Sequence, residues 1–333
     1  MSTAPVPAAP PPSAVVSAAR LPGSRRGGAG GRRPSIMARR EERRFWLFLS
    51  PWVVGFIVFG AGPLIGSIVL SLTDYSLLSS PNWVGLDNYR TMVADSLFWR
   101  SLLNTLYFGV ASVVLGVVFT LLIAILLNQR VRGQTFFRLV FYLPSVVAGI
   151  ATALLWKNIL DPDFGLINLV LGWFGIQGPG WLQSPSWAIP GLVLMTVWGA
   201  GNTIVIYLAG LQSVPRTLYE SVTLDGCGAW GRFRHVTIPM MSPVIFFNVI
   251  TGFIASLQAY VLILVMTGGA GGQAAGGPEN STLVLGLYIY RQAFRYYDFG
   301  YAAALSWALF AIILVITAIQ FSLARRWVHY DGK

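Results

Sequence analysis

The sequence predicts an all-α membrane protein with six transmembrane helices. Of its 333 residues, 55% are hydrophobic and only 11% are charged, whereas an ordinary soluble domain has about 25% charged residues. Six apolar stretches are each long enough to cross about 30 Å of hydrocarbon at about 1.5 Å of helix rise per residue. This composition excludes most soluble enzymes, and it excludes a nucleic-acid-binding module despite a net charge of +11.

The six predicted spans contain no Asp, Glu or Lys. They cover residues 45–72, 102–127, 136–156, 188–211, 243–266 and 302–323. Glycine and proline interrupt three of them, at Gly60, Gly62, Pro63, Pro144, Gly199 and Gly201. Inside a membrane, such interruptions are tolerated only where neighbouring helices or a water-filled cavity satisfy the freed backbone groups. We therefore expect a bundle that encloses a pathway.

The distribution of basic residues predicts the orientation of the chain. Eighteen of the 23 Lys and Arg residues fall in alternate aqueous segments that include both termini and the loop 212–242. The other five fall in the segments between them. Because cytoplasmic loops carry an excess of basic residues, both termini and the loop 212–242 are predicted to be cytoplasmic.

Two segments outside the spans have a distinctive composition. Residues 1–40 are rich in Pro, Ala, Gly, Ser and Arg and lack the apolar run of a signal peptide, so we expect a disordered basic arm in the cytoplasm. We favour a solvated arm that fixes the topology of the chain over an arm that binds anionic lipid or RNA. Residues 41–333 form the six-span domain. Within it, residues 166–174 are apolar but too short to span, and we expect them at the membrane interface or packed on the bundle.

The sequence contains no pattern of a catalytic or metal site. Its only cysteine is Cys227, and its two histidines, His235 and His329, lie far apart. Neither lysine follows a glycine-rich phosphate-binding loop. We therefore expect no enzyme activity, no metal and no cofactor, so that a separate protein would have to supply any ATP-driven step.

The loop 212–242 carries the most specific signal. A helix capped by Ser213 is predicted to begin at Pro215 and to end at Gly226, which can adopt the left-handed conformation. A second short helix, around residues 229–235, is predicted to stop at Pro239. Two short helices joined by a glycine turn would form a compact knob on the cytoplasmic face.

This loop resembles the "EAA" loop of the membrane subunits of bacterial ATP-binding-cassette importers. The matching residues are Glu220-Ser221-Val222, where the family usually has Glu-Ala-Ala, followed by Asp225-Gly226, Phe233, Ile238-Pro239 and Pro243. Four more stretches are similar to the carbohydrate-importer branch: residues 83–89, Asn104-Thr105, Leu143-Pro144 and residues 164–168. The resemblance covers about residues 44–327. It is a resemblance to maltose- and glycerol-phosphate-type permeases and, of the two membrane subunits, to the maltose-type first subunit.

The resemblance implies the type I importer permease fold in a bacterial cell membrane. It also implies a homologous second permease, two ATP-binding-cassette ATPase subunits and an extracytoplasmic sugar-binding protein as partners. The knob would be the coupling helix that docks into an ATPase groove, with Glu220 fixing its register. The coupling residues that the resemblance assigns are Glu220, Ser221, Val222, Asp225, Gly226, Phe233 and Pro239. An interfacial helix without a partner is the alternative.

No charged residue lies deep in a span, since Arg138 is at the entry of the third, and this argues against coupling to protons or sodium through titratable side chains. Sugars are recognised by amide and hydroxyl groups and by aromatic rings. The candidates for a substrate path are Thr196, Trp198, Ser256, Gln258 and Tyr260, and the resemblance adds Ser145. Hydrogen bonding between helices is the alternative role for each of them.

The predicted function is therefore that of the permease subunit of an importer for sugars or related polyols, working by alternating access. The alternatives are an importer permease for another solute, such as glycerol phosphate, phosphate or an amino acid, or an ion-coupled secondary carrier. An anionic solute would call for an Arg near the path, and no Arg lies deep in a predicted span. The loop 212–242 argues against a membrane enzyme or a scaffold.

Overall fold

The computed structural model describes residues 36–77, 79–129, 132–268 and 275–328. The chain divides into two units, Met1–Gly60 and Ala61–Lys333. The first unit contains α1 (Ile36–Phe56), in which Trp52 and Phe56 stack with ring centroids 5.6 Å apart. This helix begins at Ile36, inside the segment 1–40 that was expected to be a disordered arm. Residues 1–35 lie outside the described part of the chain.

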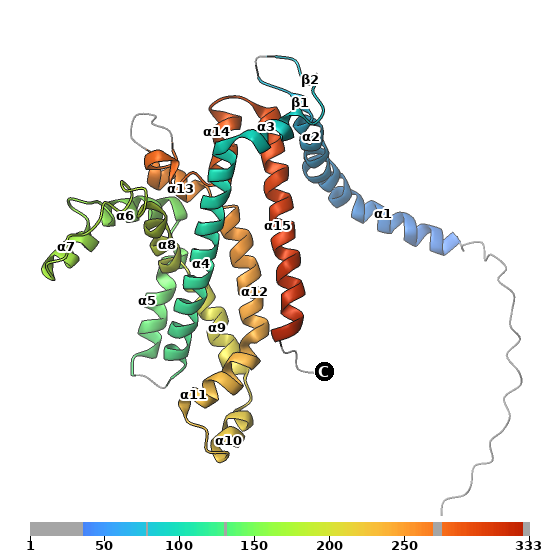
Figure 1. Ribbon diagram of the computed structural model, residues 1–333. Helices are drawn as coiled ribbons and strands as arrows, with labels where there is room; N and C mark the ends of the chain where they lie inside the picture. The colour runs from blue at the N-terminus through green and yellow to red at the C-terminus, as the bar shows by residue number, and fades with distance from the viewer. Residues whose placement is uncertain (1–35, 78, 130–131, 269–274, 329–333) are drawn as a thin grey trace, which may run out of the picture. The chain divides into compact units, whose positions relative to one another are not determined.

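The second unit is almost entirely helical (Figure 1). A π-helical turn, η1 (Ile57–Ala61), leads into it. Its longer helices are α2 (Gly62–Ser71), α4 (Ser96–Asn128), α5 (Gln134–Val146), α6 (Gly149–Ile159), α8 (Ala188–Trp198), α9 (Gly201–Ser213), α12 (Ile238–Leu257), α14 (Leu285–Phe294) and α15 (Phe299–Trp327). Its shorter elements are α3 (Asp87–Ala94), α7 (Leu166–Trp173), α10 (Arg216–Leu224), α11 (Ala229–Arg232), η2 (Phe233–Thr237), α13 (Val261–Thr267) and η3 (Pro278–Asn280). The strands β1 (Thr73–Asp74) and β2 (Asn82–Trp83) pair antiparallel.

Four helices in the described ranges are long and apolar enough to cross a membrane unbroken. They cover Arg43–Ser71, Ser96–Asn128, Ala229–Leu257 and Phe299–Trp327. Two helix pairs also qualify but are bent: α5 with α6 by 103° and α8 with α9 by 51°. The six predicted spans are recovered when each bent pair counts as one span. The first span is not broken at Gly60, Gly62 and Pro63, because the π turn η1 carries the helix on to the proline.

The fifth span differs from the prediction at both ends. It was expected to start at Pro243 and to extend to Met266, after a separate helix stopped by Pro239. In the structure one helix continues from Ala229 to Leu257, and Pro239 lies in the first turn of α12. The π turn η2 precedes this proline, and the Ile238 amide donates to the Phe233 carbonyl five residues back. This wider turn accommodates a residue that has no amide hydrogen.

The fourth span breaks between α8 and α9, at the predicted glycines. A Cβ atom on Gly201 would lie 2.3 Å from the Phe141 carbonyl oxygen, so α9 approaches the backbone of α5 too closely for a side chain. The third span breaks at Val147 and Ala148, whereas Pro144 lies within α5. The prediction of a break is confirmed for the third span, but its position is displaced by three residues.

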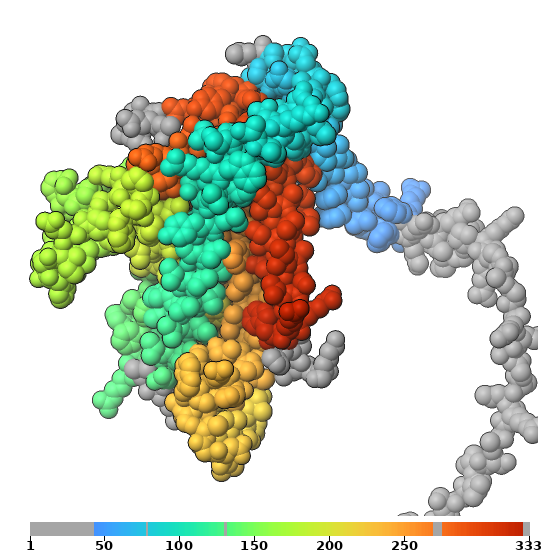
Figure 2. All heavy atoms as spheres, viewed as in Figure 1, coloured from blue at the N-terminus to red at the C-terminus, as the bar shows by residue number. Residues whose placement is uncertain are grey.

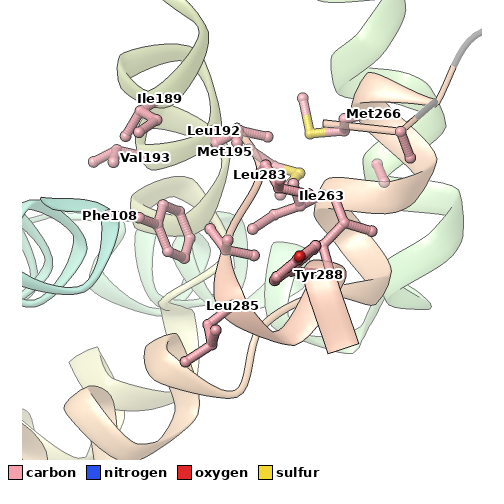
Figure 3. Packing of buried hydrophobic residues seen from close by; sticks show 14 of the residues in the cluster. Phe108, Ile189, Leu192, Val193, Met195, Ile263, Met266, Leu283, Leu285 and Tyr288 are labelled. Atoms are coloured by element: carbon pink, nitrogen blue, oxygen red, sulfur yellow. The ribbon is translucent and has the colours of Figure 1, made fainter. Parts of the chain in front are cut away.

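The largest hydrophobic core lies where α4, α8, α13 and α14 meet (Figure 3). Phe108 of α4 faces Leu192 and Met195 of α8, and Ile263 of α13 packs with them. A second core joins α4, α9 and α12 around the fully buried Tyr207. These cores hold α4 in the middle of the second unit. We call its two ends the α14 end and the α10 end.

Polar contacts fasten the α14 end. The Asp95 carboxylate accepts a hydrogen bond from the Leu97 amide at 2.9 Å, which caps α4, and it also accepts from the hydroxyls of Tyr288 and Tyr301. The Asn104 side-chain amide donates to the Asn280 and Leu283 carbonyls at 2.9 and 3.1 Å. These contacts tie α4, α14 and α15 together across about two hundred residues of sequence.

Candidate functional site

The predicted knob lies at the α10 end, beyond α9 and α12 (Figure 1). The helix α10 begins after Pro215 and ends at Leu224, Asp225 is its C-cap, and Gly226 follows with φ of 80° as expected. Ser213 is not its cap, because this residue ends α9 and its hydroxyl donates to the Gly210 carbonyl at 2.7 Å. The Tyr219 and Thr237 hydroxyls, 3.1 Å apart, fix α10 against η2.

The surface of the knob combines acidic and apolar side chains. Glu220, Ser221 and Asp225 are exposed, and Leu224 and Trp230 are exposed over 89% and 70% of their area. Three other predicted coupling residues, Val222, Phe233 and Pro239, are half-buried. Such a convex apolar patch with an acid on it is typical of a protein-binding surface.

Deeper in the second unit, a cavity of about 340 Å³ lies between α4, α8, α9, α12 and α13. None of the described residues that line it is charged. Its polar lining consists of hydroxyl and amide side chains: Ser112, Thr120, Thr196, Thr203, Asn248 and Ser256. A volume of this size is within the range of small-molecule binding sites.

The cavity is also where two helix breaks meet. Ala200, between α8 and α9, and Ala259, between α12 and α13, both line it. The Ser256 hydroxyl donates to the Phe253 carbonyl at 3.0 Å and keeps its lone pairs for another donor. The Ser112 hydroxyl is buried and has no hydrogen-bond partner among the described residues. The cavity can therefore offer acceptors and donors to a neutral, polar molecule.

The structure brings only two of the six predicted path residues to this cavity. Thr196 and Ser256 line it. Trp198 instead packs edge-on against Trp156, and Tyr260 stacks on Tyr290 with centroids 5.8 Å apart. Gln258 is exposed at the end of α12, and the Ser145 hydroxyl donates to the Tyr142 carbonyl within α5. None of these four residues lines the cavity.

Sequence reasoning missed the contribution of α4 to the cavity. Ser112, Gly116 and Thr120 all line it, and they recur at intervals of four along the helix, so they share one face. This spacing of small and hydroxyl residues in an otherwise apolar helix was the available signal.

Residues 116–329 match the family described as the binding-protein-dependent transport system inner membrane component. The chain belongs to this family. The family and its apolar helices make the chain a multi-pass membrane protein. The resemblance predicted from the loop 212–242 is confirmed.

Several relatives are similar over nearly their whole length. The probable ABC transporter permease protein YesP of Bacillus subtilis is 37% identical over 89% of this chain and 94% of its own. The lactose transport system permease protein LacF of Rhizobium radiobacter is 37% identical over 87% and 97%, respectively. The trehalose/maltose transport system permease protein MalF of Thermococcus litoralis is 31% identical over 87% and 97%. These relatives are named as transport permeases, not as enzymes.

A solved structure supports the same fold. It is the crystal structure of a bacterial ABC transporter involved in the import of the acidic polysaccharide alginate. The likeness has a TM-score of 0.72 with 25% identical residues, and it covers 89% of this chain and 99% of the solved one. The predicted all-α, type I permease fold is confirmed.

Proposed function

We propose that this chain is the membrane-spanning permease subunit of an ATP-binding-cassette importer that translocates sugars, as mono- or oligosaccharides, or related polyols. The observation that carries the proposal is the uncharged cavity at the meeting of two helix breaks. Most of its lining is apolar, its hydroxyl and amide side chains can hydrogen-bond sugar hydroxyls, and no ionised group of the lining would favour an anion or a cation. The names of the lactose and trehalose/maltose relatives support a sugar as the solute.

The chain would work within a larger assembly. We expect a homologous second permease beside it, two ATPase subunits on the cytoplasmic side and a sugar-binding protein outside the membrane. Both termini and the knob would be cytoplasmic in a bacterial cell membrane, since eighteen of the 23 basic residues lie on that side.

Coupling would pass through the knob. Glu220 would pair with a basic group at the rim of an ATPase groove, while Leu224 and Trp230 would fill the apolar part of that groove. Closure of the ATPase dimer would displace α10, and the contact of Tyr219 with Thr237 would transmit this displacement to α12. Because α12 lines the cavity, the movement would open the path alternately to each side.

Two variants of the reconstituted assembly test these roles separately. Glu220→Lys should abolish binding of the ATPase subunits, whereas Ala255→Trp should fill the cavity and abolish sugar uptake with ATPase binding intact. ATPase co-purification and uptake of radiolabelled sugar by vesicles are the two readouts. Asp163→Lys is the matched control, because it makes the same charge change away from the knob and should leave ATPase binding unchanged.

Normal uptake by the Ala255→Trp variant would contradict the proposed path. Unchanged ATPase binding by the Glu220→Lys variant would contradict the coupling role. The two results are independent, because the cavity and the knob have no residue in common.

A further inference from the structure

The helix α7 is apolar on two opposite faces. Ile167 and Leu171, four residues apart, are partly buried and pack against the large hydrophobic core. Leu166, Leu169 and Trp173 lie on the opposite side, Val170 lies at its edge and Phe174 follows directly after the helix; all five are exposed. We call these five residues the α7 apolar face.

The α7 apolar face is unusually open for a set of large hydrophobic side chains. Trp173 and Phe174 are exposed over 76% and 75% of their area, and Leu166 over 59%. Figure 2 shows the segment, in yellow-green, standing out from the side of the second unit. A helix that is hydrophobic all round is normally enclosed by protein or by membrane, and the described part of this chain covers only one side.

Side-chain contacts hold the α7 apolar face in one orientation. The Asn168 side-chain amide donates to the Pro162 and Pro179 carbonyls at 3.1 and 3.2 Å. The Asn168 Oδ1 atom accepts from the indole nitrogen of Trp181 at 2.7 Å. The Asp161 carboxylate accepts from the Phe164 amide just before the helix. One asparagine thus joins both flanks of α7, so the exposed face belongs to a fixed element.

The bend before α6 and the order of the helices place α7 between the two ends of the second unit. The thirteen residues of α5 measure about 20 Å at 1.5 Å per residue, which is shorter than the hydrocarbon core of about 30 Å. The chain then turns by 103° into α6 before α5 has covered that full thickness, so the third span is completed beyond the bend. The fourth span runs through α8 and α9 to the knob at the α10 end. Because α7 precedes α8 in the chain, α7 lies toward the opposite, α14 end.

The composition of the segment fits lipid better than protein. The sequence has no Lys, Arg, Asp or Glu from residue 164 to residue 215, so the face offers no charge to a protein partner. With eight residues α7 is about 12 Å long and about 10 Å across, so one face of it covers on the order of 120 Å², well below the roughly 800 Å² per partner of a stable protein interface. Tryptophan is enriched at the membrane–water boundary, so Trp173 at the end of α7 fits that level.

We propose that the α7 apolar face lies in the interfacial layer of the bilayer, on the α14 side, and holds the α6–α7 corner against lipid. Leu166, Leu169 and Val170 would contact the acyl chains, and Trp173 would lie at the level of the headgroups. The occupant of this face is therefore lipid and not a second subunit.

Fluorescence quenching in vesicles tests the proposal. In a Cys227→Ser background, Trp173→Cys and Leu169→Cys are labelled with an environment-sensitive fluorophore, and the full chain is reconstituted with its assembly in phosphatidylcholine–phosphatidylglycerol vesicles. Lipids with a nitroxide near the headgroup end of the acyl chain should quench these labels severalfold more than a label at Gln183→Cys. Gln183 is exposed in the loop after α7 and serves as the aqueous control. Iodide in the aqueous phase should instead quench the label at residue 183 more than the labels at residues 169 and 173.

Leu171→Cys, on the inner face of the same helix, should be quenched weakly by both reagents. Labels at residues 169 and 173 that respond like the label at residue 183 would overturn the proposal, because the face would then be in water. Lipid quenching that appears only when the chain is reconstituted alone would also overturn it, since a protein subunit would then cover the face in the assembly. The use of two positions on one face keeps the test valid if one variant does not fold.

Discussion

Asp95 illustrates how much depends on a single side chain at the α14 end. Its carboxylate caps α4 and accepts hydrogen bonds from Tyr288 and Tyr301, which are 193 and 206 residues away in the sequence. Burial, and after it the hydrogen bond to Asp95, raise the pKa of Tyr288 from 10.0 to about 12. From the sequence Asp95 could be predicted only as an acid between two spans, because no local pattern indicates two distant tyrosines as partners.

The raised pKa of Tyr288 gives a pH prediction with a definite sign. Below pH 10 the hydroxyl is protonated in both the folded and the unfolded chain, and wild type should exceed Tyr288→Phe in stability by about 1.5–3 kcal/mol, as for a hydrogen bond to a charged group. As the pH rises from 10 to 12, the tyrosine ionises first in the unfolded chain, so this advantage should shrink. Thermal unfolding of both proteins in detergent at pH 8 and pH 11 measures this difference in stability.

Tyr297→Phe, at an exposed position, is the control for the general effect of alkali. A difference between wild type and Tyr288→Phe that stays constant up to pH 12 would show that the hydroxyl is not held by Asp95.

At the scale of elements, the bent spans show where sequence patterns suffice and where they do not. The break near Gly199 and Gly201 was predicted correctly, because the close backbone approach of α9 to α5 requires a glycine. The break after Pro144 was misplaced, since a proline in a helix can be tolerated without ending it. Pro239 was misread for the same reason, as the π turn before it continues the helix. Such tolerance depends on neighbouring helices, which the local sequence does not encode.

The contact between α5 and α9 predicts a large effect from one added methyl group. In Gly201→Ala the new Cβ would lie 2.3 Å from the Phe141 carbonyl oxygen, so the two helices must separate. We expect a loss of stability of about 1–3 kcal/mol, as for other overpacked sites. Gly66→Ala in α2 is the matched control, because a Cβ there meets nothing within 4 Å; this change should be neutral or should stabilise by up to about 1 kcal/mol. Equal melting temperatures of the two variants would contradict the close packing.

At the scale of the whole molecule, the number of spans could be predicted because each is a long run without Asp, Glu or Lys. The assembly of these spans could not, since contacts such as that of Asn104 with the Asn280 and Leu283 carbonyls join residues 176 and 179 positions apart. For the same reason the cavity was predicted only in part. Thr196 and Ser256 were identified from their polarity, whereas Trp198 and Tyr260 turned out to pack on other aromatic rings.

The proposed orientation of the molecule can be tested with its only cysteine. Cys227 is partly exposed beside the knob and should react with a membrane-impermeant maleimide in inverted vesicles but not in intact cells. In a Cys227→Ser background, Glu279→Cys, exposed at the α14 end, should show the opposite pattern. Labelling of Cys227 in intact cells would reverse the proposed topology. Expression without the ATPase subunits provides the control for masking of the thiol.

The two helix breaks at the cavity have a mechanical consequence. Each half, α8, α9, α12 or α13, is a separate helix with its own ladder of backbone hydrogen bonds. If the halves tilt during the proposed transport, the change in backbone dihedral angles would fall on residues 199–200 and 258–260, which lie between them. Both pivots lie at the cavity wall, so a small rotation there would change the width of the passage while the rest of each helix keeps its internal geometry.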